Sequence, residues 1–163
     1  MSPRIEKAID IFLDALNNGT LRKGTCGGCA VANLIANGLG IKISSTNVIG
    51  NPKIRLWGNL FCTFNSVQSL NSLQPSFLEE IKETIDSTDF TVEELMKIEF
   101  AFETNTIILY TNYNYFSKNA IFQDQLKGLE AVVKVMLEFD ESKNDVKEIF
   151  TKKAIHNFQL QTI

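Results

Sequence analysis

The segment from Gly24 to Ala30 contains the residue types that could perform thiol chemistry. It reads Gly-Thr-Cys-Gly-Gly-Cys-Ala, so Cys26 and Cys29 stand three positions apart. We expect it to begin a helix over 26–37, with Thr25 as the N-cap. Two glycines in the first turn cost a helix about 1 kcal/mol each relative to alanine. Close backbone approach, ligand access or an unusual turn should offset that cost.

One interpretation of this segment is dithiol redox chemistry. A cysteine at a helix N-terminus meets unpaired N–H groups and the positive end of the helix dipole, which favour the thiolate. Cys26 would then be the attacking thiol, and Cys29, one turn later, would resolve a mixed disulfide. The motif resembles, over four residues, the Cys-x-x-Cys of thioredoxin-like proteins, where a strand precedes the helix. Here a helix and a polar connector precede it.

Two further resemblances concern the same cysteines. Carboxymuconolactone decarboxylase relatives carry Cys-x-x-Cys on a helix of an all-α domain, with a His four residues later where this chain has Asn33. The run also resembles the Cys-Gly-Ser-Cys of papain-like proteases, which implies Cys29 as nucleophile and His156 as base. Lys23 stands where that family has its oxyanion-hole Gln, and Ala30 replaces the expected Trp.

Anion binding is a third possibility for the same stretch. Gly27 and Gly28 would expose backbone donors at a helix start, and Arg22 and Lys23 would add two cations, which suits a phosphate or carboxylate. The pattern is neither a Walker loop nor a dinucleotide fingerprint.

A metal variant would join all three cysteines with the one histidine, as a tetrahedral set of Cys26, Cys29, Cys62 and His156. Because no second paired knuckle accompanies Cys26 and Cys29, we assign no metal ligand and no cofactor. Against every chemical interpretation stands packing: a buried cysteine behaves as a small hydrophobe, and adjacent glycines let another helix cross closely. We favour packing.

Aromatic residues near position 110 offer a different kind of site. Tyr113 and Tyr115, interleaved with asparagines, could form the polar-aromatic surface that is enriched at protein interfaces. Stacking on RNA is less favoured, because only Lys118 is nearby to neutralise phosphates.

Composition limits the function classes. The chain has 163 residues, 44% of them hydrophobic, with a net charge of −3 and a pI near 5.2. This predicts a single domain over 1–163 with no attraction for nucleic acid. No apolar run approaches the ~18 residues of a membrane span. Three cysteines are too few for a disulfide-stapled fold, so we expect a cytoplasmic protein.

Apolar spacing predicts the elements that position these segments. A stripe predicts a first helix that begins at Pro3 and stops at Gly19; it comprises Ile5, Ala8, Ile9, Phe12, Leu13 and Leu16. The predicted helix 26–37 is apolar on every side, so we expect it to be the central one, with Gly38 as its stop. Residues 39–72 fit short strands or an ordered loop equally well.

The second half of the chain has clearer helix starts. Pro75 opens a helix that ends near Asp86, and Thr91 and Glu94 have the spacing of a capping box for a helix over 92–103. Residues 106–116 suit a strand or a packed turn. A long helix should end near Phe139, followed by a short one over 146–150 and a loosely packed tail over 152–163.

The sequence thus predicts a mainly α, single-domain bundle of about six helices around a buried central helix, with a minor irregular or β segment. We expect a non-enzymatic binding or regulatory module that acts through contacts with another protein. The alternative is a dithiol redox protein that uses Cys26 and Cys29.

Overall fold

The chain folds as a helical bundle. The computed structural model describes residues 1–25, 27–43, 51–63, 75–140, 153–156 and 158–159. Within these ranges the regular elements are helical, as the sequence predicts, and no strand occurs, so the minor segment is irregular and not β. The elements are α1 (Pro3–Asn18), α2 (Ala30–Leu39), α3 (Pro52–Thr63), α4 (Pro75–Asp86), α5 (Val92–Asn105), the 3₁₀ helix η2 (Tyr110–Tyr115) and α6 (Lys118–Phe139).

Helix α1 follows its predicted pattern. Pro3 occupies the first turn, and Gly19 ends the helix in the left-handed conformation (φ 70°), which glycine adopts without strain. The whole predicted stripe is buried. Ser2 occupies the N-cap position, but its hydroxyl bonds the Asp140 carboxylate instead of capping α1.

Helix α2 is the buried central helix, but it begins later than expected. Every residue from Ala30 to Ala36 is buried. The N-cap is Cys29 in place of Thr25, so Gly27 and Gly28 lie in a turn before the helix. Gly40, not Gly38, supplies the left-handed C-cap.

Helix α3 corrects the expectation for residues 39–72. Its helical spacing buries Ile54, Trp57 and Leu60, while Pro52 stands in the first turn. Strands and helices were hard to separate here because a short aromatic run has no clear period. Residues 44–50 and 64–74 lie outside the described ranges.

Helices α4 and α5 begin where the sequence predicts. Pro75 opens α4, which ends at Asp86. Thr91 accepts the Glu94 N–H at 3.1 Å, and the Glu94 carboxylate accepts the Thr91 N–H at 3.0 Å, which completes the capping box. Helix α5 runs two residues further than expected, to Asn105.

Residues 106–117, which we call the connector, join α5 to α6. The predicted alternatives were a strand or a packed turn, and the structure is a packed turn that contains η2. Ser117 then caps α6 by accepting the Ala120 N–H at 3.1 Å, and α6 ends at Phe139 as predicted.

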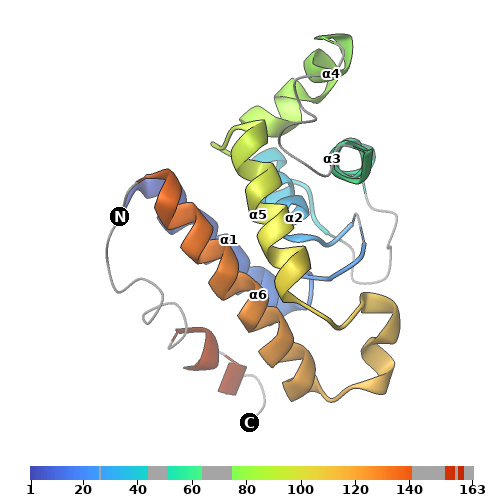
Figure 1. Ribbon diagram of the computed structural model, residues 1–163, viewed down its shortest axis with the longest axis vertical. Helices are drawn as coiled ribbons and strands as arrows, with labels where there is room; N and C mark the ends of the chain where they lie inside the picture. Colours follow the sequence, from blue (N-terminus) through green and yellow to red (C-terminus); the bar gives the residue numbers. More distant parts are fainter. Residues whose placement is uncertain (26, 44–50, 64–74, 141–152, 157, 160–163) are drawn as a thin grey trace.

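The helices pack in an order that places α2 inside the bundle. Helix α5 packs most extensively against α6, while α2 contacts α1, α3, α4 and α5. Figure 1 shows α1 alongside α6, with the N-terminus of the chain beside the C-terminal end of α6. None of the described helices combines the length and apolar composition that a bilayer crossing requires.

Part of the predicted tail contacts the bundle. Residues 153–156 are helical, and Ala154 is buried. Phe158 stacks on Phe122 of α6 with ring centroids 4.0 Å apart. The predicted helix 146–150 lies outside the described residues.

Candidate functional site

The structure brings the two predicted site regions together. The first is residues 20–25 and 27–29, which we call the glycine loop, and the second is the connector. The Tyr110 N–H donates to the Lys23 carbonyl at 3.0 Å. Gln125 of α6, itself buried, donates from its amide nitrogen to the Leu21 carbonyl at 2.6 Å and the Tyr113 hydroxyl at 2.8 Å. Two segments that are about 90 residues apart in sequence therefore form one structural unit.

Close backbone approach accounts for Gly28. Its carbonyl accepts the Arg22 N–H at 2.7 Å. A Cβ at this position would lie 2.9 Å from the Arg22 Cδ and 3.0 Å from the Thr20 carbonyl oxygen. Asn33 ties the fold of the loop together, because its amide nitrogen donates to the carbonyls of Thr20 and Cys29 at 3.1 and 2.9 Å. The Gly28 carbonyl accepts the Arg22 N–H and the Ala32 N–H donates to the Cys29 sulfur, in place of a helical bond between Gly28 and Ala32, so α2 begins only at Ala30.

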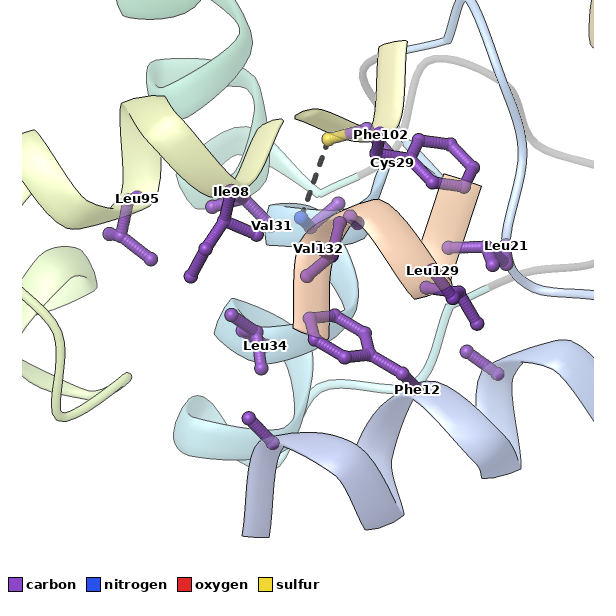
Figure 2. Close-up of a cluster of buried hydrophobic side chains, with 14 of the residues drawn as sticks. Phe12, Leu21, Cys29, Val31, Leu34, Leu95, Ile98, Phe102, Leu129 and Val132 are labelled. Carbon is purple, nitrogen blue, oxygen red and sulfur yellow. Dashed lines mark hydrogen bonds between the residues drawn. The ribbon is translucent and has the colours of Figure 1, made fainter. Parts of the chain in front are cut away.

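Cys29 is a buried residue of the core. Its side chain is 5% exposed and lies among the apolar residues in Figure 2, where the dashed line marks the bond it accepts from the Ala32 N–H at 3.4 Å. Burial raises the pKa of this thiol well above its ordinary value, and the nearby Glu99 carboxylate raises it further. The protonated thiol is therefore the stable form, which gives no support to a nucleophilic or resolving role for Cys29. Cys26 lies outside the described residues, so its reactivity stays a prediction.

Glu99 of α5 is the residue that sequence reasoning missed. It is 1% exposed, and its Oε2 accepts the Val31 N–H of α2 at 2.9 Å. Burial raises the pKa of Glu99 to about 7, and the charge of Glu103 acts in the same direction. The spacing held a signal: Glu99 stands four residues after Leu95 and three before Phe102, on the buried face of α5.

Both predicted cations contact groups of the protein itself. The Arg22 side chain is 1% exposed, and its guanidinium lies over the Tyr110 ring, 4.8 Å from the centroid. The Lys23 ammonium donates to the Glu103 carbonyl and lies 3.4 Å from the Glu103 carboxylate. The Lys23 charge is thus paired within the protein, and the Arg22 side chain is buried against Tyr110. Anion binding at Arg22, Lys23, Gly27 and Gly28 therefore stays a prediction without support from the geometry.

The connector backbone is anchored from α6. Asp124 accepts the N–H groups of Ile107 and Ile108 at 3.0 and 2.9 Å. Ile108 is buried, whereas Ile107 is 82% exposed and Leu109 is also exposed. Successive side chains of an extended backbone point to opposite sides, so Ile107 and Leu109 face solvent while Ile108 faces the core.

The two tyrosines predicted for binding have different surroundings. Tyr113 is half-buried, bonded to Gln125, with a pKa raised chiefly by burial. Tyr115 is 83% exposed, and Phe116 beside it is exposed as well. Tyr113 therefore anchors the connector, while Tyr115 is available for contact.

The remaining candidates are not assembled into a site by the described residues. His156 is exposed on the helical stretch 153–156. The side chain of Cys62 lies outside the described ranges. Within those ranges, no group of three or more His, Cys, Asp or Glu side chains could hold a metal ion.

Comparison of the chain with protein-family models, curated proteins and solved structures finds no match. The function must therefore be argued from the geometry alone.

Proposed function

We propose that this protein is a binding module that recognises another protein through its connector. The observation that carries the proposal is a concentration of exposed apolar side chains. Among the described residues, the connector bears four of the large hydrophobic side chains that face solvent, namely Ile107, Leu109, Tyr115 and Phe116. We call these four residues the connector surface. Single exposed apolar side chains are common on protein surfaces, but several of them on one segment are typical of a site that binds another protein.

The hydrogen bonds that hold the connector in place support a binding role for its exposed side chains. Asp124 holds the backbone at Ile107 and Ile108, Gln125 holds the Tyr113 hydroxyl, and Lys23 holds the Tyr110 N–H. A segment held at these three places, two through its backbone and one through a side chain, loses little conformational entropy on binding, so its exposed side chains are already positioned for contact. Aromatic side chains such as Tyr115 are also the type enriched at the centre of protein interfaces.

The expected partner is a protein with an apolar surface. Two charges beside the connector are compensated within the protein, because Lys23 pairs with Glu103 and Asp124 accepts backbone N–H groups, and a third, that of Arg22, is buried. Recognition should therefore depend on apolar contact more than on charge. We also propose that the protein is cytoplasmic. Cys29 is a free thiol, and the cytoplasm is a reducing compartment that keeps thiols in this form.

Photo-crosslinking tests the proposal. A photoreactive phenylalanine analogue replaces Tyr115, and in a matched control it replaces Lys134, an exposed residue of α6. We expect a discrete protein adduct from position 115 but not from position 134. Adding Ile107→Asp to the first variant should abolish the adduct, because a carboxylate would be desolvated in the interface. An adduct that survives Ile107→Asp, or the same adduct from both positions, would refute the proposal.

A further inference from the structure

Glu99 joins three elements at the centre of the molecule. It belongs to α5, bonds the first turn of α2 through the Val31 N–H, and lies near the indole of Trp57 in α3. Among the described residues its second oxygen, Oε1, has no hydrogen-bond partner of good geometry, and the Trp57 Nε1 has none either. An ionised carboxylate in this place would be desolvated with only one strong donor, which is unfavourable.

The groups that act on this carboxyl come from each neighbouring segment. The thiol of Cys29 precedes α2, and the indole N–H of Trp57 belongs to α3; both favour the ionised form. Glu103, one turn along α5, disfavours it, and Lys23 of the glycine loop partly neutralises Glu103. Protonation of Glu99 therefore depends on the position of the glycine loop.

Three hydrogen bonds, joined by short stretches of backbone, connect Glu99 with the connector. Its first bond reaches the N–H of Val31, two residues after Cys29. The glycine loop is then closed by the bond from the Arg22 N–H to the Gly28 carbonyl at 2.7 Å. The next residue, Lys23, accepts the Tyr110 N–H of the connector at 3.0 Å.

We propose that Glu99 is a buried proton-binding site whose protonation state controls the glycine loop and, through it, the connector. Protonated Glu99 stabilises the arrangement described above. Loss of the proton leaves a charge in the core. Displacement of the adjoining glycine loop, which reaches solvent at Gly24, then lets water hydrate the carboxylate. Burial acts on this carboxyl more strongly than any neighbouring group, so hydration outweighs the loss of the Cys29 and Lys23 contacts. The connector then loses the Lys23 carbonyl as an anchor. The coupling between Glu99 and the connector is independent of the proposed function. Only the further step, that this coupling regulates the binding of a partner, rests on it.

Amide NMR spectra of the intact protein between pH 5.5 and 8.5 test the coupling. We expect the amide signals of Val31, Arg22 and Tyr110 to move along one titration curve with a midpoint near pH 7. Glu99→Gln, which is isosteric and uncharged, should abolish the curve at all three amides. Signals in the wild type that do not titrate, or that titrate equally in Glu99→Gln, would overturn the inference.

Two more variants keep the test decisive if Glu99→Gln does not fold. Glu103→Gln removes a partly exposed negative charge, so the common midpoint should shift to lower pH. His156→Asn, which removes the one histidine of the sequence, is the control, and the midpoint should not change. A curve that disappears in His156→Asn, or is unmoved by Glu103→Gln, contradicts the inference. None of these readouts needs a partner, so failure of the crosslinking experiment leaves this test intact.

Discussion

At the scale of single residues, position and burial decide what the cysteine motif can do. The argument for a reactive thiol needs the sulfur at an open helix N-terminus. Cys29 is at that terminus, yet it is enclosed by the core and lies beside Glu99. Burial and a neighbouring carboxylate act against the thiolate, and they outweigh the helix dipole. The packing interpretation therefore describes Cys29 best.

Thiol labelling checks the state of Cys29. In the folded protein at pH 7 we expect an alkylating reagent to modify Cys29 only at the rate of transient opening, because the sulfur is buried and protonated. Labelling should become complete in denaturant. Peptide mass spectrometry separates Cys29 from the other cysteines, and rapid labelling of Cys29 without denaturant would show that its burial is wrong.

The cap made by Cys29 gives a related expectation. Cys29→Ala removes the acceptor of the Ala32 N–H and should lower the free energy of unfolding by about 1 kcal/mol. Cys29→Ser restores an acceptor that helix starts prefer, so it should recover part of this loss. Urea unfolding measures both variants. Equal stability of Cys29→Ala and the wild type would exclude a capping role.

At the scale of elements, local signals predicted the helices whose ends carry them. Thr91 and Glu94 determine the start of α5 through contacts within four residues, so the sequence alone reveals it. The start of α2 depends on Gly28 meeting Thr20 and Arg22, and Glu99 becomes visible as a site only when α5 docks on α2. Such tertiary contacts leave no local pattern. The connector was ambiguous for the same reason, since its backbone is satisfied by Asp124 of another element.

Gly128 of α6 marks a close contact of this helix with α5 and the connector. In a helix interior alanine is favoured over glycine by about 1 kcal/mol. At Gly128 of α6, however, a Cβ would lie 2.4 Å from the Thr106 Cγ2 and 2.8 Å from the Phe102 ring. We expect Gly128→Ala to destabilise the protein by about 1–3 kcal/mol in urea unfolding. The exposed neighbour Lys127 supplies the control, Lys127→Ala, which should change stability little. Stabilisation by Gly128→Ala would mean that α5 and α6 are further apart.

At the scale of the whole molecule, one arginine joins the ends of three helices. Arg4 of α1 bonds Glu94 of α5 at 2.7 and 2.9 Å and Asp140 after α6 at 2.6 Å. Burial alone would raise the pKa of Glu94, but bonds from Arg4 and the Thr91 N–H hold it below its ordinary value. The Arg4 bond likewise lowers the pKa of Asp140. These carboxylates stabilise the fold above their unfolded pKa values, and this contribution is lost as the pH falls through the lowered ones.

Stability should therefore have an optimum on the acid side of neutrality. The raised pKa of Glu99 has the opposite sign: its contribution is complete below 4.5, the ordinary value, and is lost as the pH rises to about 7. The difference between these two pKa values corresponds to roughly 3 kcal/mol of the free energy of unfolding. We expect urea unfolding to give a higher free energy of unfolding at pH 5 than at pH 8. Glu99→Gln should remove most of the difference, and an equal fall in Glu99→Gln would assign it to other groups.

The affinity of the partner captured at position 115 tests the central claim most directly. Calorimetric titration compares the wild type with Tyr115→Ala and with Phe100→Ala, which removes an exposed aromatic ring from α5, outside the connector. If the connector surface recognises the partner, Tyr115→Ala should weaken binding by about fivefold or more, corresponding to about 1 kcal/mol, while Phe100→Ala leaves it unchanged. Unchanged affinity in Tyr115→Ala, or an equal loss in Phe100→Ala, would contradict the account.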